Sequence, residues 1–176
     1  MSELNLLKAT ALLPSRVMEF RQAFLSAEEY SIPGSRGLHN YESYEDWLRL
    51  VKECEKPDNT LLGVQASTYF AVRLDDDTVV GCIELRHTLN EALAFCGGHI
   101  GFSTVPTERR KGYATQMLQM MHAEAKKIGL DKVLLTCDID NIGSYKTIEA
   151  CGGVREQEEA YELDGEPFYR YWIRVS

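Results

Sequence analysis

The sequence predicts an α/β protein in which helices cover a mixed, mostly antiparallel sheet. Residues 68–74 and 78–86 are rich in β-branched and apolar side chains, and three aspartates separate them, which is typical of a hairpin. Residues 111–128 repeat apolar side chains at helical spacing. This helix lies between two apolar segments, 98–105 and 132–137, so strand, helix and strand form a crossover unit with a central parallel pair.

The residues before the hairpin predict one strand and two helices. A short apolar strand spans residues 4–7, and a helix begins near Ser15, where a valine and two phenylalanines follow at helical spacing. Residues 31–37 are predicted to form a loop because they contain Pro, Gly and Ser. Residues 41–54 form the second helix.

The residues after the parallel pair predict one more helix and two strands. The helix spans residues 141–151, and the strands turn at Asp164 and Gly165 and end in residues 169–175. In all, about seven strands and about four helices are expected. No repeat, low-complexity tract or linker interrupts the chain, so residues 1–176 are predicted to form a single domain.

Composition excludes several classes of protein. Hydrophobic residues make up 44% and charged residues 26%, as in ordinary globular proteins. No apolar run approaches the roughly 20 residues that cross a bilayer, and the N-terminus lacks a signal-peptide pattern, so a cytoplasmic protein is expected. The net charge of -8 argues against binding to nucleic acid or anionic membranes. The five cysteines show no metal-ligand spacing, so reduced thiols and no metal site are expected.

One short segment carries recognisable chemistry. The predicted long helix begins with the sequence Arg-Arg-Lys-Gly-Tyr-Ala at residues 109–114. A glycine-bearing turn at a helix start offers unpaired backbone N–H groups and the positive end of the helix dipole, which together bind phosphate. Taken alone, such a basic turn is more often only solvated. Its place after one strand and before a helix and a parallel strand favours a phosphate site.

These residues resemble the signature of the GCN5-related N-acetyltransferase (GNAT) superfamily. The signature stands here as Arg109-x-x-Gly112-x-Ala114, and the resemblance extends to residues 98–103 upstream and to Asn141-x-x-Ser144 downstream. It implies a GNAT-like fold and one N-acetyltransferase domain. In that domain residues 1–67 hold the N-terminal strand and acceptor-side helices, and residues 68–176 hold the sheet and the core that binds coenzyme A.

The resemblance also implies the reaction. Acetyl-CoA is expected to lie between the strands that end at Val105 and Cys137, and to give its acetyl group to a primary amine by direct attack in a ternary complex. The acceptor is a small molecule or a peptide, and the protein is expected to be a monomer or homodimer. The expected contacts with the cofactor are Ser103, Thr104, Val105, Arg109, Arg110, Lys111, Gly112, Tyr113, Ala114, Thr115, Asn141 and Ser144.

Two residues are candidates for the general base. Similarity to the histone-acetylating branch puts His99 where that branch carries its catalytic glutamate, if a one-residue gap is allowed, and a histidine pKa near 6.5 suits proton transfer at neutral pH. Glu84, within an apolar strand, is the second candidate. Structural interpretations compete with both. His99 is also explained as a half-buried strand residue with a satisfied hydrogen bond, and Glu84 as a residue on the solvent face of an alternating strand.

The general acid is less clear. Many members of the superfamily protonate the thiolate with a tyrosine in the last helix, but the matching residue here is Ile148. Tyr145, three residues earlier, is the nearest candidate, with packing in the core or protonation by water as alternatives. Aromatic residues that either wall the acceptor site or pack in the core are Tyr30, Tyr41, Trp47, Tyr69 and Tyr169.

Other functions are excluded or kept as rivals. No dinucleotide-binding G-x-G-x-x-G follows a strand, and neither a Walker-type loop nor a G-x-S-x-G elbow occurs. A non-catalytic module that binds acyl-CoA as a sensor remains the alternative, because the missing tyrosine fits it.

Overall fold

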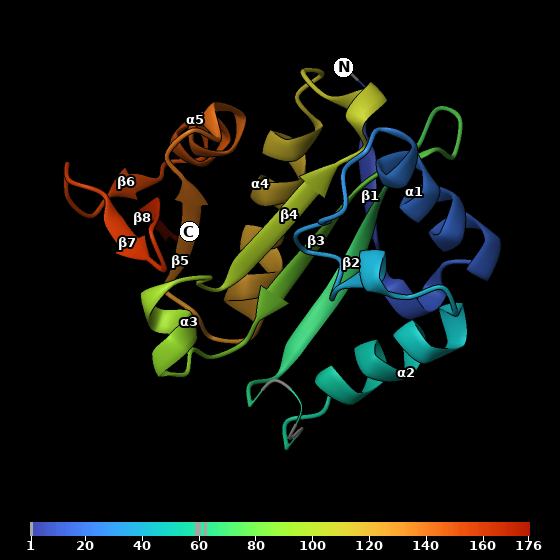
Figure 1. The fold of residues 1–176 in the computed structure, drawn as a ribbon, viewed down its shortest axis with the longest axis horizontal. Helices are drawn as coiled ribbons and strands as arrows, with labels where there is room; N and C mark the ends of the chain where they lie inside the picture. The colour runs from blue at the N-terminus through green and yellow to red at the C-terminus, as the bar shows by residue number, and fades with distance from the viewer. Residues whose placement is uncertain (1, 59–60, 62) are drawn as a thin grey trace.

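The computed structural model describes residues 2–58, 61 and 63–176. Within these residues, eight strands form two four-stranded sheets that lie side by side (Figure 1). The first sheet has the order β1-β2-β3-β4, and all neighbours are antiparallel. Its strands are β1 (Leu4–Lys8), β2 (Ala66–Arg73), β3 (Val79–Arg86) and β4 (Ile100–Thr104).

The second sheet is built around the last strand of the chain. Strand β8 (Glu166–Arg174) lies between β5 (Lys132–Asp138) and β6 (Val154–Arg155), and β7 (Tyr161–Leu163) forms a hairpin with its start. All these pairs are antiparallel. The predicted α/β class with a mostly antiparallel sheet is therefore confirmed.

Helices cover both faces of the first sheet. Helices α1 (Pro14–Ser26) and α2 (Tyr44–Cys54) pack on one face, and α4 (Tyr113–Lys127) packs on the other. Strand β2 shows the alternation that this requires, since Phe70 packs with α1 and α2 while Ala71 packs with α4. The side chains of α4 belong to one core with residues of both sheets, so α4 joins the sheets from behind.

The remaining elements differ in how well the sequence predicted them. Helix α5 (Ile142–Ala150) covers the second sheet near its predicted place. Helix α2 begins at Tyr44 rather than at residue 41, because Ser43 caps it by accepting a 3.3 Å hydrogen bond from the N–H of Asp46. The five-residue helix α3 (Glu91–Phe95) and the two-residue strand β6 were not predicted, since segments this short carry no periodicity.

Strands β4 and β5 meet at one joint and then diverge, so the predicted parallel pair does not form a hydrogen-bonded ladder. At the joint the N–H of His99 donates to the carbonyl of Leu134 (2.7 Å), and the N–H of Leu134 donates to the ring Nδ1 of His99 (2.9 Å). The His99 side chain thus occupies the Leu134 N–H, which a ladder between β4 and β5 would otherwise use. Gly98 permits the close approach, because a Cβ there would lie 2.3 Å from the Leu134 oxygen.

Candidate functional site

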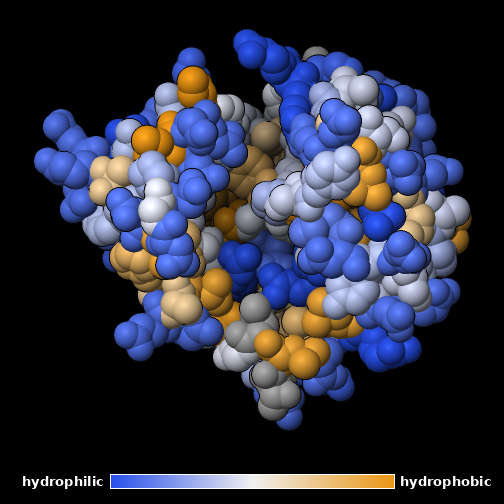
Figure 2. Space-filling model, in the orientation of Figure 1, coloured by the Kyte–Doolittle hydropathy of each residue, from blue (hydrophilic) through white to orange (hydrophobic). Residues whose placement is uncertain are grey.

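A pocket of about 1080 Å³ opens where β4 and β5 diverge. Figure 2 shows the surface hollowed between the half built on the first sheet and the half built on α5 and the second sheet. The pocket is lined by the end of α1 and the loop after it, β4, the turn before α4, and the starts of α4 and α5. Its lining residues are Phe24, Glu29, Ser31, Pro33, Phe102, Ser103, Thr104, Pro106, Glu108, Arg109, Arg110, Gly112, Tyr113, Ala114, Thr115, Asn141, Ile142, Gly143, Ser144, Lys146 and Thr147.

The start of α4 presents unpaired backbone donors to this pocket. Gly112 occupies the N-cap position in the left-handed region, with φ of 82°, and no side chain caps the helix. The first three N–H groups of a helix have no partner within it, here those of Tyr113, Ala114 and Thr115. The helix dipole adds positive potential at the same point. This end of α4 can therefore hold an anion.

The three basic residues of the turn differ in their partners. Arg109 forms two hydrogen bonds to the Glu29 carboxylate, of 2.7 and 2.6 Å, and Lys111 forms an ion pair of 2.9 Å with Glu108. Arg110 has no charged partner among the described residues, and its backbone adopts a left-handed conformation with φ of 62°. Arg110 is therefore the cation of the turn that is available to an incoming anion.

Strand β4 presents an open edge to the pocket. His99 and Val105 make backbone hydrogen bonds to the β3 side, through the Arg86 N–H and the Val80 carbonyl. Because antiparallel pairing uses alternate residues, the backbone groups of Phe102 and Thr104 face away from β3. The Thr104 carbonyl accepts a 3.1 Å bond from Nε of Arg109 on this side. An extended ligand can therefore pair with the open edge.

Helix α5 supplies the opposite wall. Asn141 caps this helix, because its side-chain oxygen accepts a 3.2 Å hydrogen bond from the N–H of Ser144. The cap leaves the amide NH2 of Asn141 as a donor at the pocket. Lys146, also exposed, adds a positive charge to this wall.

Ten of the twelve predicted cofactor contacts line the pocket. The two exceptions are Val105, which is buried in the core with α1 and α2, and Lys111, which pairs with Glu108. Ser103 lines the pocket but donates its hydroxyl to the Pro33 carbonyl (2.6 Å), so it also fixes the loop after α1. The pocket thus combines uncapped helix N–H groups, an open strand edge and basic side chains.

Comparison with known proteins identifies the family. Residues 15–154 match the model of the acetyltransferase (GNAT) domain. The chain belongs to the GNAT acetyltransferase family. It is therefore an acyltransferase by family. The curated N-acetyltransferase YjdG of Bacillus subtilis, itself described as uncharacterized, is 31% identical over 78 residues. That match covers 44% of the chain and 42% of YjdG, so the chain spans less than half of this relative.

Solved GNAT structures share the fold over nearly the whole chain. The spermidine N-acetyltransferase of Vibrio cholerae, in complex with CoA and spermine, has a TM-score of 0.65 at 16% identity, covering 98% of this chain and 95% of that one. An acetyltransferase of Salmonella typhimurium that modifies the N-terminal serine of ribosomal protein L7/L12 has a TM-score of 0.66 at 17% identity, covering 100% and 97%. At these identities the likeness shows the fold alone.

His99, the first candidate base, lies at the joint between the sheets and not on the pocket wall. Its side chain is only 6% exposed, and its Nδ1 already accepts from Leu134. Burial, followed by the nearby Arg86 charge, lowers the pKa of His99 to about 4. The ring is therefore neutral at pH 7, and its visible role is to connect β4 with β5.

Glu84, the second candidate base, is completely buried in β3 rather than on a solvent face. Its carboxylate accepts two hydrogen bonds from Arg36 and lies 3.1 Å from Nε of Arg86. Arg36 belongs to the loop after α1, and Arg86 donates to the carbonyls of Gly97 and Gly98. Glu84 thus connects two loops to β3, and it does not line the pocket.

The candidate acid and its alternative position are both used in packing. Ile148, where many GNAT members carry a tyrosine, is fully buried in the core behind the sheets. The ring of Tyr145 packs edge-on against Tyr169, with centroids 6.2 Å apart, and lies 6.0 Å from the Arg155 guanidinium. Tyr145 does not line the pocket either.

The proposed aromatic walls of the acceptor site are also absent from the pocket. Trp47 is fully buried and donates its ring N–H to the Ser35 carbonyl (2.8 Å), and Tyr69 is buried in the core on the α4 side. Tyr30 is 68% exposed. Core packing is therefore the role of Trp47 and Tyr69.

Sequence patterns missed the residues that α1 and its following loop bring to the pocket. Phe24, Glu29, Ser31 and Pro33 lie about 80 residues before the basic turn at residues 109–114, and no motif connects them to it. The only available signal was the charge of Glu29, a carboxylate that needs a partner if it folds next to a basic turn.

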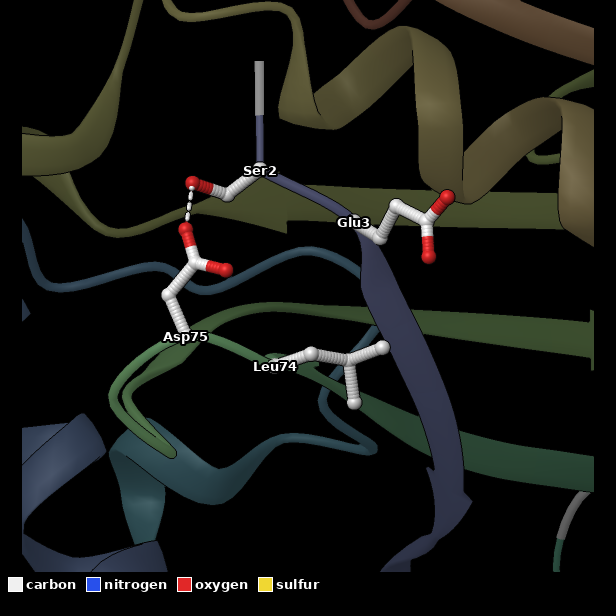
Figure 3. A pocket seen from close by; sticks show the side chains of 4 residues that line it. All are labelled: Ser2, Glu3, Leu74 and Asp75. Carbon is white, nitrogen blue, oxygen red and sulfur yellow. Dashed lines mark hydrogen bonds between the residues drawn. The ribbon is translucent and has the colours of Figure 1, made fainter.

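A second, shallower pocket of about 430 Å³ lies at the far edge of the first sheet and has no catalytic character. Figure 3 shows the Ser2 hydroxyl bonded to Asp75, with Glu3 and Leu74 beside them. Among the described residues, no three His, Cys, Asp or Glu side chains gather as a metal site. No helix in the described part of the chain is long and apolar enough to cross a membrane.

Proposed function

We propose that this protein transfers an acetyl group from acetyl-CoA to a primary amine, by direct attack in a ternary complex. The observation that carries the proposal is the uncapped start of α4, which opens into a pocket between two diverging strands. Pyrophosphate fits the N–H groups of Tyr113 to Thr115, and Arg110 adds the charge that is free to bind it.

The rest of the pocket suits the remainder of coenzyme A. The pantetheine arm carries amide groups, and the open edge of β4 at Phe102 and Thr104 offers backbone donors and acceptors to pair with them. The NH2 group of Asn141 and the hydroxyl of Ser144 contact the cofactor from the α5 wall. Family members use acetyl-CoA, and the Vibrio cholerae relative is described in complex with CoA.

Acetyl-CoA, when bound, supplies an activated thioester. The amine nitrogen attacks its carbonyl carbon, a C–N bond forms and the C–S bond breaks. The nitrogen loses one proton, and the departing thiolate of coenzyme A takes up one proton to become the free thiol. No histidine lines the described part of the pocket, and its carboxylates, Glu29 and Glu108, lie beside the basic turn where the pyrophosphate is proposed to bind. In this proposal the amine therefore gives its proton to water, and His99 and Glu84 act through the structure rather than on the substrate.

The acceptor is a small molecule or a peptide with a primary amine. Two relatives of the same fold support this class, because one is named for spermidine and the other modifies the N-terminal serine of a ribosomal protein. Spermidine and an N-terminal serine both carry a primary amine.

The direct test combines binding with thiol release. Purified protein is titrated with acetyl-CoA in a calorimeter, and release of free thiol is then followed with polyamines, amino acids and peptides with free N-termini. We expect micromolar binding and amine-dependent thiol release. Binding without thiol release for any amine would instead identify an acyl-CoA sensor.

A matched pair of glycine variants tests the site itself. Gly112→Asp and Gly129→Asp both place an aspartate at a left-handed glycine, with φ of 82° and 85°, at the two ends of α4. Both variants therefore carry similar backbone strain, but only Gly112→Asp puts a negative charge where pyrophosphate approaches. We expect Gly112→Asp to weaken acetyl-CoA binding at least 100-fold, and Gly129→Asp to leave it unchanged. Equal affinities for the two folded variants would refute the site.

A further inference from the structure

Arg109 is already occupied by a carboxylate from another part of the chain. Its Nη1 and Nη2 donate to the two oxygens of Glu29 at 2.7 and 2.6 Å, and its Nε donates to the Thr104 carbonyl at 3.1 Å. The Glu29 contact is the two-bond geometry in which arginine also binds phosphate. Both Glu29 and Arg109 line the large pocket, although they are 80 residues apart in sequence.

This pairing conflicts with pyrophosphate binding in two ways. The outer edge of the guanidinium is fully used by Glu29, which leaves one N–H on each terminal nitrogen for any other acceptor. The Glu29 carboxylate also adds a negative charge beside the place where two phosphate charges must enter. A bound pyrophosphate and an intact pair therefore compete for one arginine.

The pair is exposed enough to exchange. The side chains of Glu29 and Arg109 are 36% and 42% exposed, so water replaces their hydrogen bonds when they separate. The hydrogen bonds from Arg109 lower the pKa of Glu29, so the carboxylate is charged at neutral pH and the pair is formed. A partly exposed pair of this kind contributes little to stability, whereas a pyrophosphate brings twice the charge to the same donors.

We propose that Glu29 occupies Arg109 in the free protein and is displaced by the pyrophosphate of coenzyme A, so that Glu29 sets how tightly the cofactor binds. In the free protein Glu29 takes the place of the pyrophosphate. The Glu29 carboxylate and the Thr104 carbonyl together hold the Arg109 side chain in position, and the competition from Glu29 lowers the affinity for coenzyme A. The inference rests on the proposed function, because it assumes that coenzyme A lies in this pocket.

A set of isosteric variants tests the exchange. Coenzyme A is titrated calorimetrically into wild type, Glu29→Gln, Glu28→Gln, Arg109→Gln and the Glu29→Gln/Arg109→Gln double variant. Glu28 is the matched control, since it is an exposed glutamate one residue away that has no contact with Arg109 among the described residues. We expect Glu29→Gln to bind coenzyme A about threefold to tenfold more tightly, and Glu28→Gln to stay within about twofold of wild type.

The double variant and a truncated ligand show whether Glu29 changes the affinity for coenzyme A through Arg109. If Glu29 acts through Arg109, the double variant binds like Arg109→Gln, because no arginine remains to be released. Pantetheine, which has no phosphate, should bind wild type and Glu29→Gln equally. Unchanged or weaker coenzyme A binding in Glu29→Gln would overturn the exchange and make the pair a permanent support.

The two proposals fail in distinguishable ways. If Gly112→Asp binds coenzyme A as well as wild type does, the cofactor does not use this turn and the proposed function loses its site. If Gly112→Asp loses binding while Glu29→Gln gains none, the site holds and only the exchange of partners is wrong.

Discussion

Polar groups are buried and paired near the joint between β4 and β5, but exposed and partly unpaired at the start of α4. His99 at the joint and Glu84 in the neighbouring strand β3 are both buried, and they are hydrogen-bonded to Leu134 and Arg36 respectively. At the start of α4, backbone N–H groups are left without a side-chain cap, Arg110 has no charged partner among the described residues, and the charged partner of Arg109 is the partly exposed Glu29.

The difference separates structural polar residues from those available to a ligand. A buried charge needs its partners to offset desolvation, and it is too costly to move for each catalytic cycle. A partly exposed donor exchanges partners with water at little cost. Residue type alone identified Glu84 and His99 as candidates for chemistry, but burial and partners assign both to the framework.

The largest effect is expected at Glu84. Glu84→Gln leaves Arg36 and Arg86 buried without a carboxylate, so the free energy of unfolding should fall by about 3–5 kcal/mol in urea titrations. The same substitution at the exposed pair, Glu29→Gln, should change it by less than about 1 kcal/mol. Similar losses for the two variants would remove the distinction between the two regions.

A smaller effect is expected at His99. His99→Ala leaves the buried N–H of Leu134 without an acceptor, which should cost about 1–3 kcal/mol of unfolding free energy. His87→Ala is the control, since His87 is only half-buried and bonds the Ser67 hydroxyl. If His99 were the base, turnover of the folded variant would instead fall about 100-fold, with stability little changed.

The pH dependence of stability gives an independent measure of His99. In the unfolded chain the imidazole takes up a proton near pH 6.5, but in the folded protein its pKa is about 4 because the ring is buried. Protonation therefore favours unfolding, and the His99 contribution is complete above pH 6.5 and is lost progressively as the pH falls toward 4. The urea midpoint should fall less steeply in His99→Ala than in wild type over this range.

The smallest effect is expected at Tyr145. Tyr145→Phe keeps the ring contact with Tyr169, and its hydroxyl makes no hydrogen bond among the described residues. Turnover should stay within about twofold of wild type, as it should for Tyr169→Phe. A loss near 100-fold confined to Tyr145→Phe would restore it as the acid that protonates the thiolate.

Local patterns predicted those parts of the fold that local physics decides. The hairpin of β2 and β3 and the long helix α4 lie within a few residues of their predicted ends, and Gly129 adopts the left-handed conformation expected after a helix. The turn at residues 109–114 was predicted for the same reason, since its spacing and its place before α4 are both local. The single-domain prediction and the role of each pocket residue stay predictions.

Long-range contacts decided what the sequence could not predict. Alternation along β3 placed Glu84 on a solvent face, but Arg36, 48 residues away, buries it. The parallel pair failed because the side chain of His99 takes the backbone donor of Leu134. Nothing in the sequence near residues 109–114 indicated that Glu29 would contact Arg109.

One wall of the pocket is strand β4 of the first sheet and the opposite wall is helix α5, which covers the second sheet, and no ladder connects the two sheets beyond the joint. A ladder would hold neighbouring strands about 4.8 Å apart whatever their side chains. Here the spacing is set by the residues packed behind both sheets, among them the fully buried Met117 and Met121 of α4, whose side chains adapt readily to the space available. The width of the pocket is thus determined by core residues that do not line it.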